Sequence, residues 1–213
     1  MRVLTLVGDT WHPPAVVSDG LKGLGDRGFR FDFCDTVGSE TPGLLADYAA
    51  AILAKANHRS ARDASPWLTA AGAEAVAAWV RDGGGLLVLH SGLVAYDDCP
   101  ALTALVGGRF ARHPEPCPVT VRPAAGRGLA ADLAPFTTVD EHYFVALDDD
   151  YADVFLYSES RHGTQPAGWC GMRDAGRVCA VTPGHFAGVW RQRAYRAIVR
   201  QSLDWVAARA AAR

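Results

Sequence analysis

Apolar and polar positions along the first half of the chain follow two alternating patterns. Short continuous runs of apolar, β-prone residues are separated by segments in which apolar residues recur every three or four positions. A short apolar run fits a strand buried on both faces, and the wider spacing fits a helix with one buried face. The predicted strands are residues 3–7, 29–34, 49–53 and 86–89.

Three helices are predicted from the wider spacing. One begins after Pro14, and one is capped by Thr69 and stopped by the glycines at 83–85. The third lies near the carboxyl terminus and has the clearest apolar stripe. The residues on the three stripes are Val16, Val17, Leu21 and Leu24; Ala73, Val76, Ala77 and Val80; and Tyr195, Ile198, Val199, Leu203 and Val206.

The order of these elements predicts the fold class. Strands that alternate with helices indicate parallel pairing through right-handed crossovers, and therefore an α/β fold with a doubly wound sheet. The second half differs, because four prolines between residues 114 and 123 exclude a helix there. We expect its β-prone runs to extend the sheet with antiparallel strands; they are residues 119–121, 137–139, 154–157 and 177–181. A chain of 213 residues fits a single domain, 1–213.

The amino-acid composition limits the kinds of binding partner that we expect for the protein. A net charge of -2 argues against a nucleic-acid surface, which needs clustered Lys and Arg. No apolar stretch approaches the roughly 18 residues that would span a bilayer. The five cysteines are odd in number and lack CxxC spacing, so they predict neither a disulfide framework nor a thiolate zinc site. A cytoplasmic protein without membrane or nucleic-acid partners is expected, and a homo-oligomer stays open.

Histidines follow several of the predicted strands. His12, His90 and His185 each come after a strand, His113 lies at a predicted element end, and Glu141 follows another β-prone run. Because ligands of open α/β sheets bind at the carboxyl ends of the strands, these side chains are expected to meet in one polar pocket. The alternative for any single histidine is a local hydrogen bond with no role in function. Glycines beside His90 and His185 favour the functional interpretation.

Hydroxyl and aromatic side chains near the same edge are candidate binding groups. Ser91 lies on a strand-to-helix turn, where a nucleophile elbow would present its serine. The elbow needs glycine two residues to either side, and those positions are Leu89 and Leu93. Ser91 is therefore predicted to cap a helix or to hydrogen-bond a ligand. Tyr143 and Trp190 are predicted to contact substrate, since aromatic faces suit the apolar faces of sugars.

A metal site stays open without being assigned. Imidazole and carboxylate groups suit zinc and its neighbours, but the chain has neither HxH nor HExxH spacing. Glu141 and His142 are adjacent, so in a strand they would point to opposite faces. No metal ligand is assigned, and the cofactor is unknown, with a divalent metal as one option.

Four motifs together resemble one known family. They are residues 84–92 (GGLLVLHSG), residues 107–110 with His113, residues 140–143 (DEHY), and residues 176–185 with Trp190. Their order and spacing resemble the ThuA-like (trehalose utilisation) family over about residues 53–205. That resemblance implies a flavodoxin-like, class I glutamine amidotransferase-like three-layer sandwich with a mostly parallel central sheet. It also implies a link to carbohydrate use, including oxidised (keto) sugars.

Laid against the amidotransferase pattern, the resemblance puts His90 where the nucleophilic cysteine stands. Imidazole cannot form the thioester that glutamine hydrolysis requires, so amidotransferase activity is not expected. The leading hypothesis is an enzyme that acts on a small carbohydrate, a sugar or keto-sugar derivative, by acid–base chemistry. Its catalytic residues would be His90, His185 and Glu141. The substrate-binding residues would be Ser91, His113, Tyr143, Trp190 and His12.

Two rival functions remain at this point. One is a sugar-binding or regulatory module that keeps the fold without catalysis. The other is a metal-dependent hydrolase, which would require a bound ion.

Overall fold

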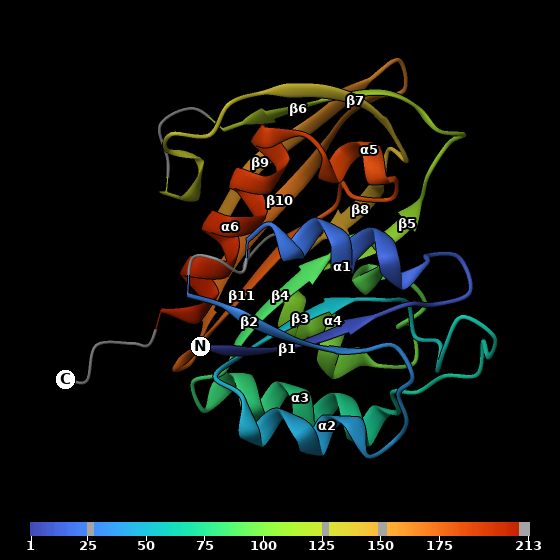
Figure 1. The fold of residues 1–213 in the computed structure, drawn as a ribbon, viewed down its shortest axis with the longest axis vertical. Coiled ribbons are helices and arrows are strands. Elements are labelled where there is room, and N and C mark those ends of the chain that lie inside the picture. The colour runs from blue at the N-terminus through green and yellow to red at the C-terminus, as the bar shows by residue number, and fades with distance from the viewer. Residues whose placement is uncertain (25–27, 125–127, 149–152, 209–213) are drawn as a thin grey trace.

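A computed structural model describes residues 1–24, 28–124, 128–148 and 153–208. In that part of the chain nine strands form one sheet, in the order β2-β1-β3-β4-β11-β10-β9-β6-β7, and β5 pairs with β8 (Figure 1). The strands are β1 Arg2–Val7, β2 Arg30–Cys34, β3 Ala50–Ala54, β4 Gly85–Leu89, β5 Gly108–Arg112, β6 Cys117–Pro123, β7 Phe136–Asp140, β8 Phe144–Leu147, β9 Asp153–Ser160, β10 Gly163–Arg173 and β11 Gly176–Val181.

The sheet has a parallel half and an antiparallel half. Strands β2, β1, β3, β4 and β11 pair in parallel, which confirms the α/β prediction. Strands β10, β9, β6 and β7 continue the sheet with antiparallel pairs, which confirms the predicted extension. The sheet as a whole is therefore mixed. Neither β10 nor the antiparallel pair of β5 and β8 was expected from the sequence.

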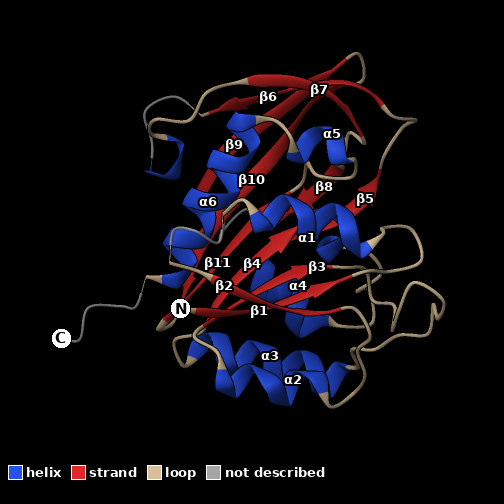
Figure 2. Cartoon of the chain, in the orientation of Figure 1, coloured by secondary structure: helices blue, strands red, loops and turns tan. Residues whose placement is uncertain are grey.

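Helices cover the parallel half on both faces, as Figure 2 shows. Helices α1, α5 and α6 lie on one side, where α6 contacts β4 and β11 and α5 contacts both α1 and α6. Helices α3 and α4 contact each other and β11 on the other side, with α2 against α3. The helices are α1 Pro14–Lys22, α2 Thr41–Leu44, α3 Ala70–Arg81, α4 Pro100–Val106, α5 Ala187–Trp190 and α6 Arg193–Ala207, with 3-10 turns η2 Leu45–Asp47, η3 His90–Leu93 and η4 Gly128–Ala130.

Alternate residues of the central strands pack into two separate hydrophobic cores, one on each face of the sheet. Leu87 and Leu89 pack in the core under α6, whereas Leu86 and Val88 pack in the core under α3. This period of two within a continuously apolar run is what a strand buried on both faces requires. The sheet is therefore anchored on both sides, and the carboxyl end of β4 is held in a fixed position.

The three predicted helices are present with the predicted faces. The Thr69 side chain caps α3 by accepting a hydrogen bond from the Gly72 amide, 3.2 Å away. The five stripe residues of the carboxyl-terminal helix are all buried in α6. No helix among the described residues is both long and apolar enough to cross a membrane.

Candidate functional site

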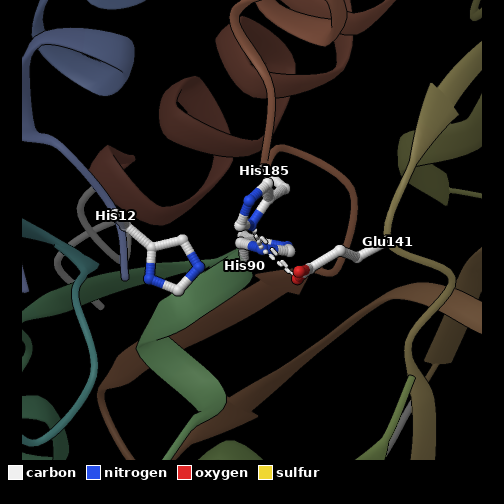
Figure 3. A group of neighbouring side chains, drawn as sticks. All are labelled: His12, His90, Glu141 and His185. Carbon is white, nitrogen blue, oxygen red and sulfur yellow. Dashed lines mark hydrogen bonds and ion pairs between the residues drawn. The ribbon is translucent and has the colours of Figure 1, made fainter. Parts of the chain in front are cut away.

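Four side chains from distant parts of the sequence meet at the carboxyl edge of the parallel strands. His12 follows β1, His90 follows β4, His185 follows β11, and Glu141 follows β7. Figure 3 shows His90 and His185 between His12 on one side and Glu141 on the other. Each residue offers one nitrogen or oxygen ligand atom, and these atoms all lie within 4.8 Å of one another. We call these four residues the pocket cluster.

Short contacts join the members of the pocket cluster. Glu141 Oε2 lies 3.1 Å from His185 Nδ1 and 3.3 Å from His90 Nε2. The two imidazoles are themselves 3.3 Å apart, from His90 Nε2 to His185 Nδ1. The Tyr143 hydroxyl adds a contact of 3.1 Å to His90 Nε2. The structure thus brings together the three residues that the sequence predicted as catalytic.

The backbone holds His90 in an unusual conformation at the end of β4. Its φ is 42°, in the left-handed region that residues other than glycine rarely adopt. Gly92 allows this tight turn, because a Cβ there would collide with the Leu53 carbonyl oxygen. His90 Nδ1 donates to the Thr182 carbonyl oxygen at 2.7 Å, so in the neutral ring the Nε2 lone pair faces the cluster.

His12 is oriented in the same way by Asp9, which sequence reasoning missed. Asp9 Oδ1 accepts from His12 Nδ1 at 2.7 Å and also from the Trp11 and His12 amides, while Oδ2 accepts from the Ala56 amide at 2.8 Å. Burial raises the pKa of Asp9, but the hydrogen bond and charge of His12 together with the amide hydrogen bonds from Ala56 and Trp11 outweigh this, and the net shift is downward. His12 Nε2 is buried and has no hydrogen-bond partner.

A second carboxylate that the sequence did not single out positions His185. Asp140 is buried, and it accepts hydrogen bonds from the Gly184 amide at 2.8 Å and the His185 amide at 3.1 Å. Gly184 has a φ of 139°, and a Cβ there would lie 2.6 Å from the Tyr195 hydroxyl oxygen. Only glycine suits this turn, which delivers His185 to the cluster.

The electrostatics of the cluster favour an ionised carboxylate. Burial raises the pKa of Glu141, but the neighbouring imidazoles of His185 and His90 bring it well below its usual range. Burial lowers the pKa of His185, but Glu141 raises it to above its ordinary value overall. Burial also lowers the pKa of His12 and raises that of the Tyr143 hydroxyl. One negative oxygen thus faces several imidazole nitrogens.

The cluster opens into a pocket of about 530 Å³. Its wall contains aromatic rings, with Phe110 and Tyr143 at a centroid distance of 4.5 Å. His113 stands at this wall, with Nε2 3.5 Å from Glu141 Oε1. A pocket with apolar walls and a few polar groups is typical of small-molecule sites. The residues that line it are Trp11, His12, Val94, Phe110, His113, Glu141, Tyr143 and His185.

Two of the predicted binding residues do not line the pocket. Ser91 is buried within η3, and it does not cap a helix with its side chain. Trp190 is buried beside α6, and its Nε1 donates to the Gly184 carbonyl oxygen at 2.9 Å. Trp190 therefore supports the turn that carries His185 and does not reach the cavity. The sequence placed both residues at the correct edge, but it could not show which way their side chains turn.

Glu141 and His142 point away from each other, as alternation along an extended chain requires. His142 Nδ1 lies 2.7 Å from the Ser160 hydroxyl, and Nε2 lies 3.1 Å from the Ser158 hydroxyl. Burial lowers the pKa of His142. We call this group the serine-bound histidine. Glu141 alone of the two joins the pocket cluster.

Comparison with known proteins identifies the family. The family model described as "ThuA: Trehalose utilisation" matches residues 3–206, a wider span than the motifs alone indicated. The chain belongs to the ThuA family. The family description links the chain to carbohydrate use at the level of the family.

Solved structures agree with this assignment in fold. A protein described as ThuA-like from Parabacteroides merdae matches with a TM-score of 0.78 and 14% identity, over 100% of this chain and 92% of that one. Another ThuA-like protein, from Bacteroides uniformis, has a TM-score of 0.75 and 17% identity over 97% and 91%. A β-galactosidase from Rahnella has a TM-score of 0.67 and 15% identity, over 95% of this chain but 31% of its own. No curated protein matches the sequence significantly.

Proposed function

We propose that this ThuA-family protein is an enzyme that processes a small carbohydrate, a sugar or keto-sugar derivative, by proton transfer. One observation carries the proposal: a carboxylate and three imidazoles converge at the floor of a pocket whose wall is aromatic. Aromatic faces suit the apolar faces of sugar rings, and the polar floor suits their hydroxyl or carbonyl oxygens. Histidine is the natural proton donor and acceptor near neutral pH.

The two oxygens of Glu141 divide the site into two functional sides. His113 Nδ1 can donate to the Pro114 carbonyl oxygen, so Nε2, 3.5 Å from Glu141 Oε1, is the nitrogen that would take a proton from the substrate, and the carboxylate would stabilise the imidazolium that forms. Oε2 faces His185 and His90, and a protonated His185, whose pKa Glu141 raises, would stabilise the oxygen that gains charge. In a keto sugar, the C–H bond beside the carbonyl breaks, its electron pair forms a C=C bond, the π pair of the carbonyl moves to its oxygen, and His113 holds the proton. Tyr143 would hydrogen-bond a substrate hydroxyl.

Amidotransferase activity is not part of this proposal. We infer that the parallel half keeps the flavodoxin-like layering of class I glutamine amidotransferases, with His90 at the elbow position after β4. The positive φ of His90 supports this inference. An imidazole there cannot form a thioester with glutamine. The five cysteines are all free, which supports a reducing, cytoplasmic location.

A substrate screen tests the proposed function. The purified protein would be incubated with trehalose, simple glycosides and their 3-keto derivatives, and products would be followed by NMR. We expect turnover of at least one keto-sugar derivative, lost in Glu141→Gln and kept in His162→Ala, which changes an exposed histidine outside the pocket. Saturable binding without product over long incubation would contradict an enzyme and favour a sugar-binding module.

A further inference from the structure

We propose that the pocket cluster binds one divalent transition-metal ion, through nitrogen atoms of His12, His90 and His185 and one oxygen of Glu141. The ion's catalytic role would rest on the function proposed above, whereas its binding does not. The set of three imidazoles and one carboxylate is one that zinc and its neighbours prefer over magnesium or calcium. The described residues hold these four ligand atoms within 4.8 Å of one another.

The hydrogen bonds behind two of the histidines fix which nitrogen faces the cluster. His90 Nδ1 donates to a backbone carbonyl, and His12 Nδ1 donates to the Asp9 carboxylate. Both partners accept hydrogen bonds, so both Nδ1 atoms carry hydrogen and both Nε2 atoms present lone pairs. A metal-binding histidine ordinarily gives its second nitrogen to a carboxylate or a carbonyl in this way. Figure 3 shows the His12 ring with one nitrogen turned toward the other three residues.

The cluster contains more acceptors than the protein's own donors can satisfy. His90 Nε2 and Glu141 Oε2 are 3.3 Å apart, and in this tautomer both are acceptors. His12 Nε2 is buried and has no hydrogen-bond partner. Buried polar atoms in native proteins nearly always find a partner, so an orphaned lone pair aimed at a carboxylate needs an explanation. The Tyr143 hydroxyl can donate to His90 Nε2 and His185 Nδ1 to Glu141 Oε2, but His12 Nε2 still has no donor, whereas one cation would satisfy all three lone pairs together.

The surroundings leave room for a substrate beside such an ion. His12, Glu141 and His185 line the pocket of about 530 Å³, so the cluster faces the cavity on one side. Four protein ligands fill a tetrahedral site, so a substrate oxygen entering from this side would bind the ion as a fifth ligand. A bound ion would supply Lewis-acid polarisation of a substrate oxygen. Glu141 Oε1 would still face His113, so binding of a metal through Oε2 is compatible with the proposed proton transfer.

Metal titration tests the proposal without any substrate. The purified full chain would be stripped with a chelator, dialysed, and titrated with Zn²⁺ by calorimetry, with Mg²⁺ as a comparison ion. We expect one Zn²⁺ per chain with micromolar or tighter affinity and no comparable Mg²⁺ binding. His12→Ala and His185→Ala should each weaken Zn²⁺ binding at least 100-fold. His162→Ala should leave it within about threefold. Circular dichroism would establish that each variant is folded.

The outcomes separate this proposal from the proposed function. No Zn²⁺ binding by the wild type would overturn the metal site, and so would equal binding by a folded His12→Ala/His185→Ala double variant. Zn²⁺ bound by these ligands without any sugar turnover would uphold the metal site and contradict the enzyme. Full turnover by protein free of metal would uphold the enzyme and show that the ion has no catalytic role, while the titration alone decides whether the ion binds. Co²⁺ substitution gives a second readout, because its visible absorption spectrum reports imidazole and carboxylate ligation directly.

Discussion

Glu141 and His142 are neighbours in the chain, but they belong to two buried polar groups of different kinds. The serine-bound histidine uses both ring nitrogens on serine hydroxyls, so its hydrogen bonds are complete within the protein. The pocket cluster instead places several acceptors around an open cavity and leaves His12 Nε2 unpartnered. A histidine whose hydrogen bonds are complete stabilises the fold. A histidine held by one nitrogen, with the other turned to a cavity, is available for a ligand.

The largest expected difference between the two groups is in turnover. Glu141→Gln removes the negative charge that faces His113 and His185, and should lower kcat/KM by about 10²–10⁴, the usual contribution of acid–base groups. His142→Ala should leave kcat/KM within about threefold, because His142 faces away from the pocket. Steady-state assays on a substrate from the NMR screen would measure both. A similar loss in the two variants would show that the comparison is wrong.

Metal affinity should also depend on Asp9, which is not a ligand itself but fixes the ring of the proposed ligand His12. Asp9→Asn keeps an oxygen for His12 but replaces the carboxylate that fixes its ring, and should weaken Zn²⁺ binding about 10- to 100-fold. Asp19→Asn, which changes an exposed carboxylate in α1 paired with Lys22, is the matched control and should have no effect. Calorimetric titration of both variants tests this. Unchanged affinity in Asp9→Asn would mean that Asp9 does not position a ligand.

In the metal-free protein we expect the larger loss of stability in His142→Ala, the variant that keeps its turnover. His142→Ala removes one hydrogen-bond partner each from the buried Ser158 hydroxyl and from Ser160, and should lower the free energy of unfolding of metal-free protein by about 1–3 kcal/mol. It should keep the gain on adding metal, which is about 2.7 kcal/mol at a free concentration of 100 times Kd. Glu141→Gln should lose that gain. Urea unfolding with and without Zn²⁺ would measure the free energy of unfolding and its increase on metal binding. If His142→Ala abolished that increase, His142 and the pocket cluster would not be independent groups.

Lys55 extends the comparison to a buried charge that is hydrogen-bonded within the protein, and here the expected effect is confined to alkaline pH. Its Nζ donates to the carbonyl oxygens of Asp35 and Arg59 at 3.0 and 3.2 Å, and burial lowers its pKa from 10.5 to about 8. Between these values the unfolded chain binds more protons than the folded one, so stability rises with pH in that window. Below pH 8 both states are charged, and this contribution is constant.

The corresponding measurement compares wild type with Lys55→Met. The free energy of unfolding of wild type minus that of the variant should be flat below about pH 8 and should rise by about 3 kcal/mol by pH 10.5. A difference that stays flat across the whole range would mean that Lys55 titrates alike in both states.

Much of the fold could be predicted because its signals are local. The continuous run at Leu86–Leu89, the cap at Thr69 and the stripe of α6 each lie within one element, and each predicted its element correctly. Parallel topology then placed the residues after β1, β4 and β11 at one edge. Strand β10 was not predicted, because its glycines and proline break the β-prone pattern.

Which residues form the site together was harder to predict from the sequence. Metal-binding motifs are recognised when two ligands share one element, whereas each member of the pocket cluster comes from a different segment. Asp9 was readable only as a residue of a turn after β1, and its role depends on the contact with His12. Whether Trp190 or Phe110 faces the cavity depends on packing between elements, which sequence periodicity does not report.

The proposed function depends on proton transfer from a bound sugar at the side of the pocket that contains Glu141. Solvent exchange tests it most directly: a 3-keto glycoside is incubated with the protein in D₂O, and the ¹H NMR signal of the C–H beside the carbonyl is followed. The account predicts loss of this signal well above the protein-free rate with wild type and His162→Ala, and a rate at least 10²-fold lower with Glu141→Gln. Exchange no faster than in buffer, or equally fast with Glu141→Gln, would contradict it.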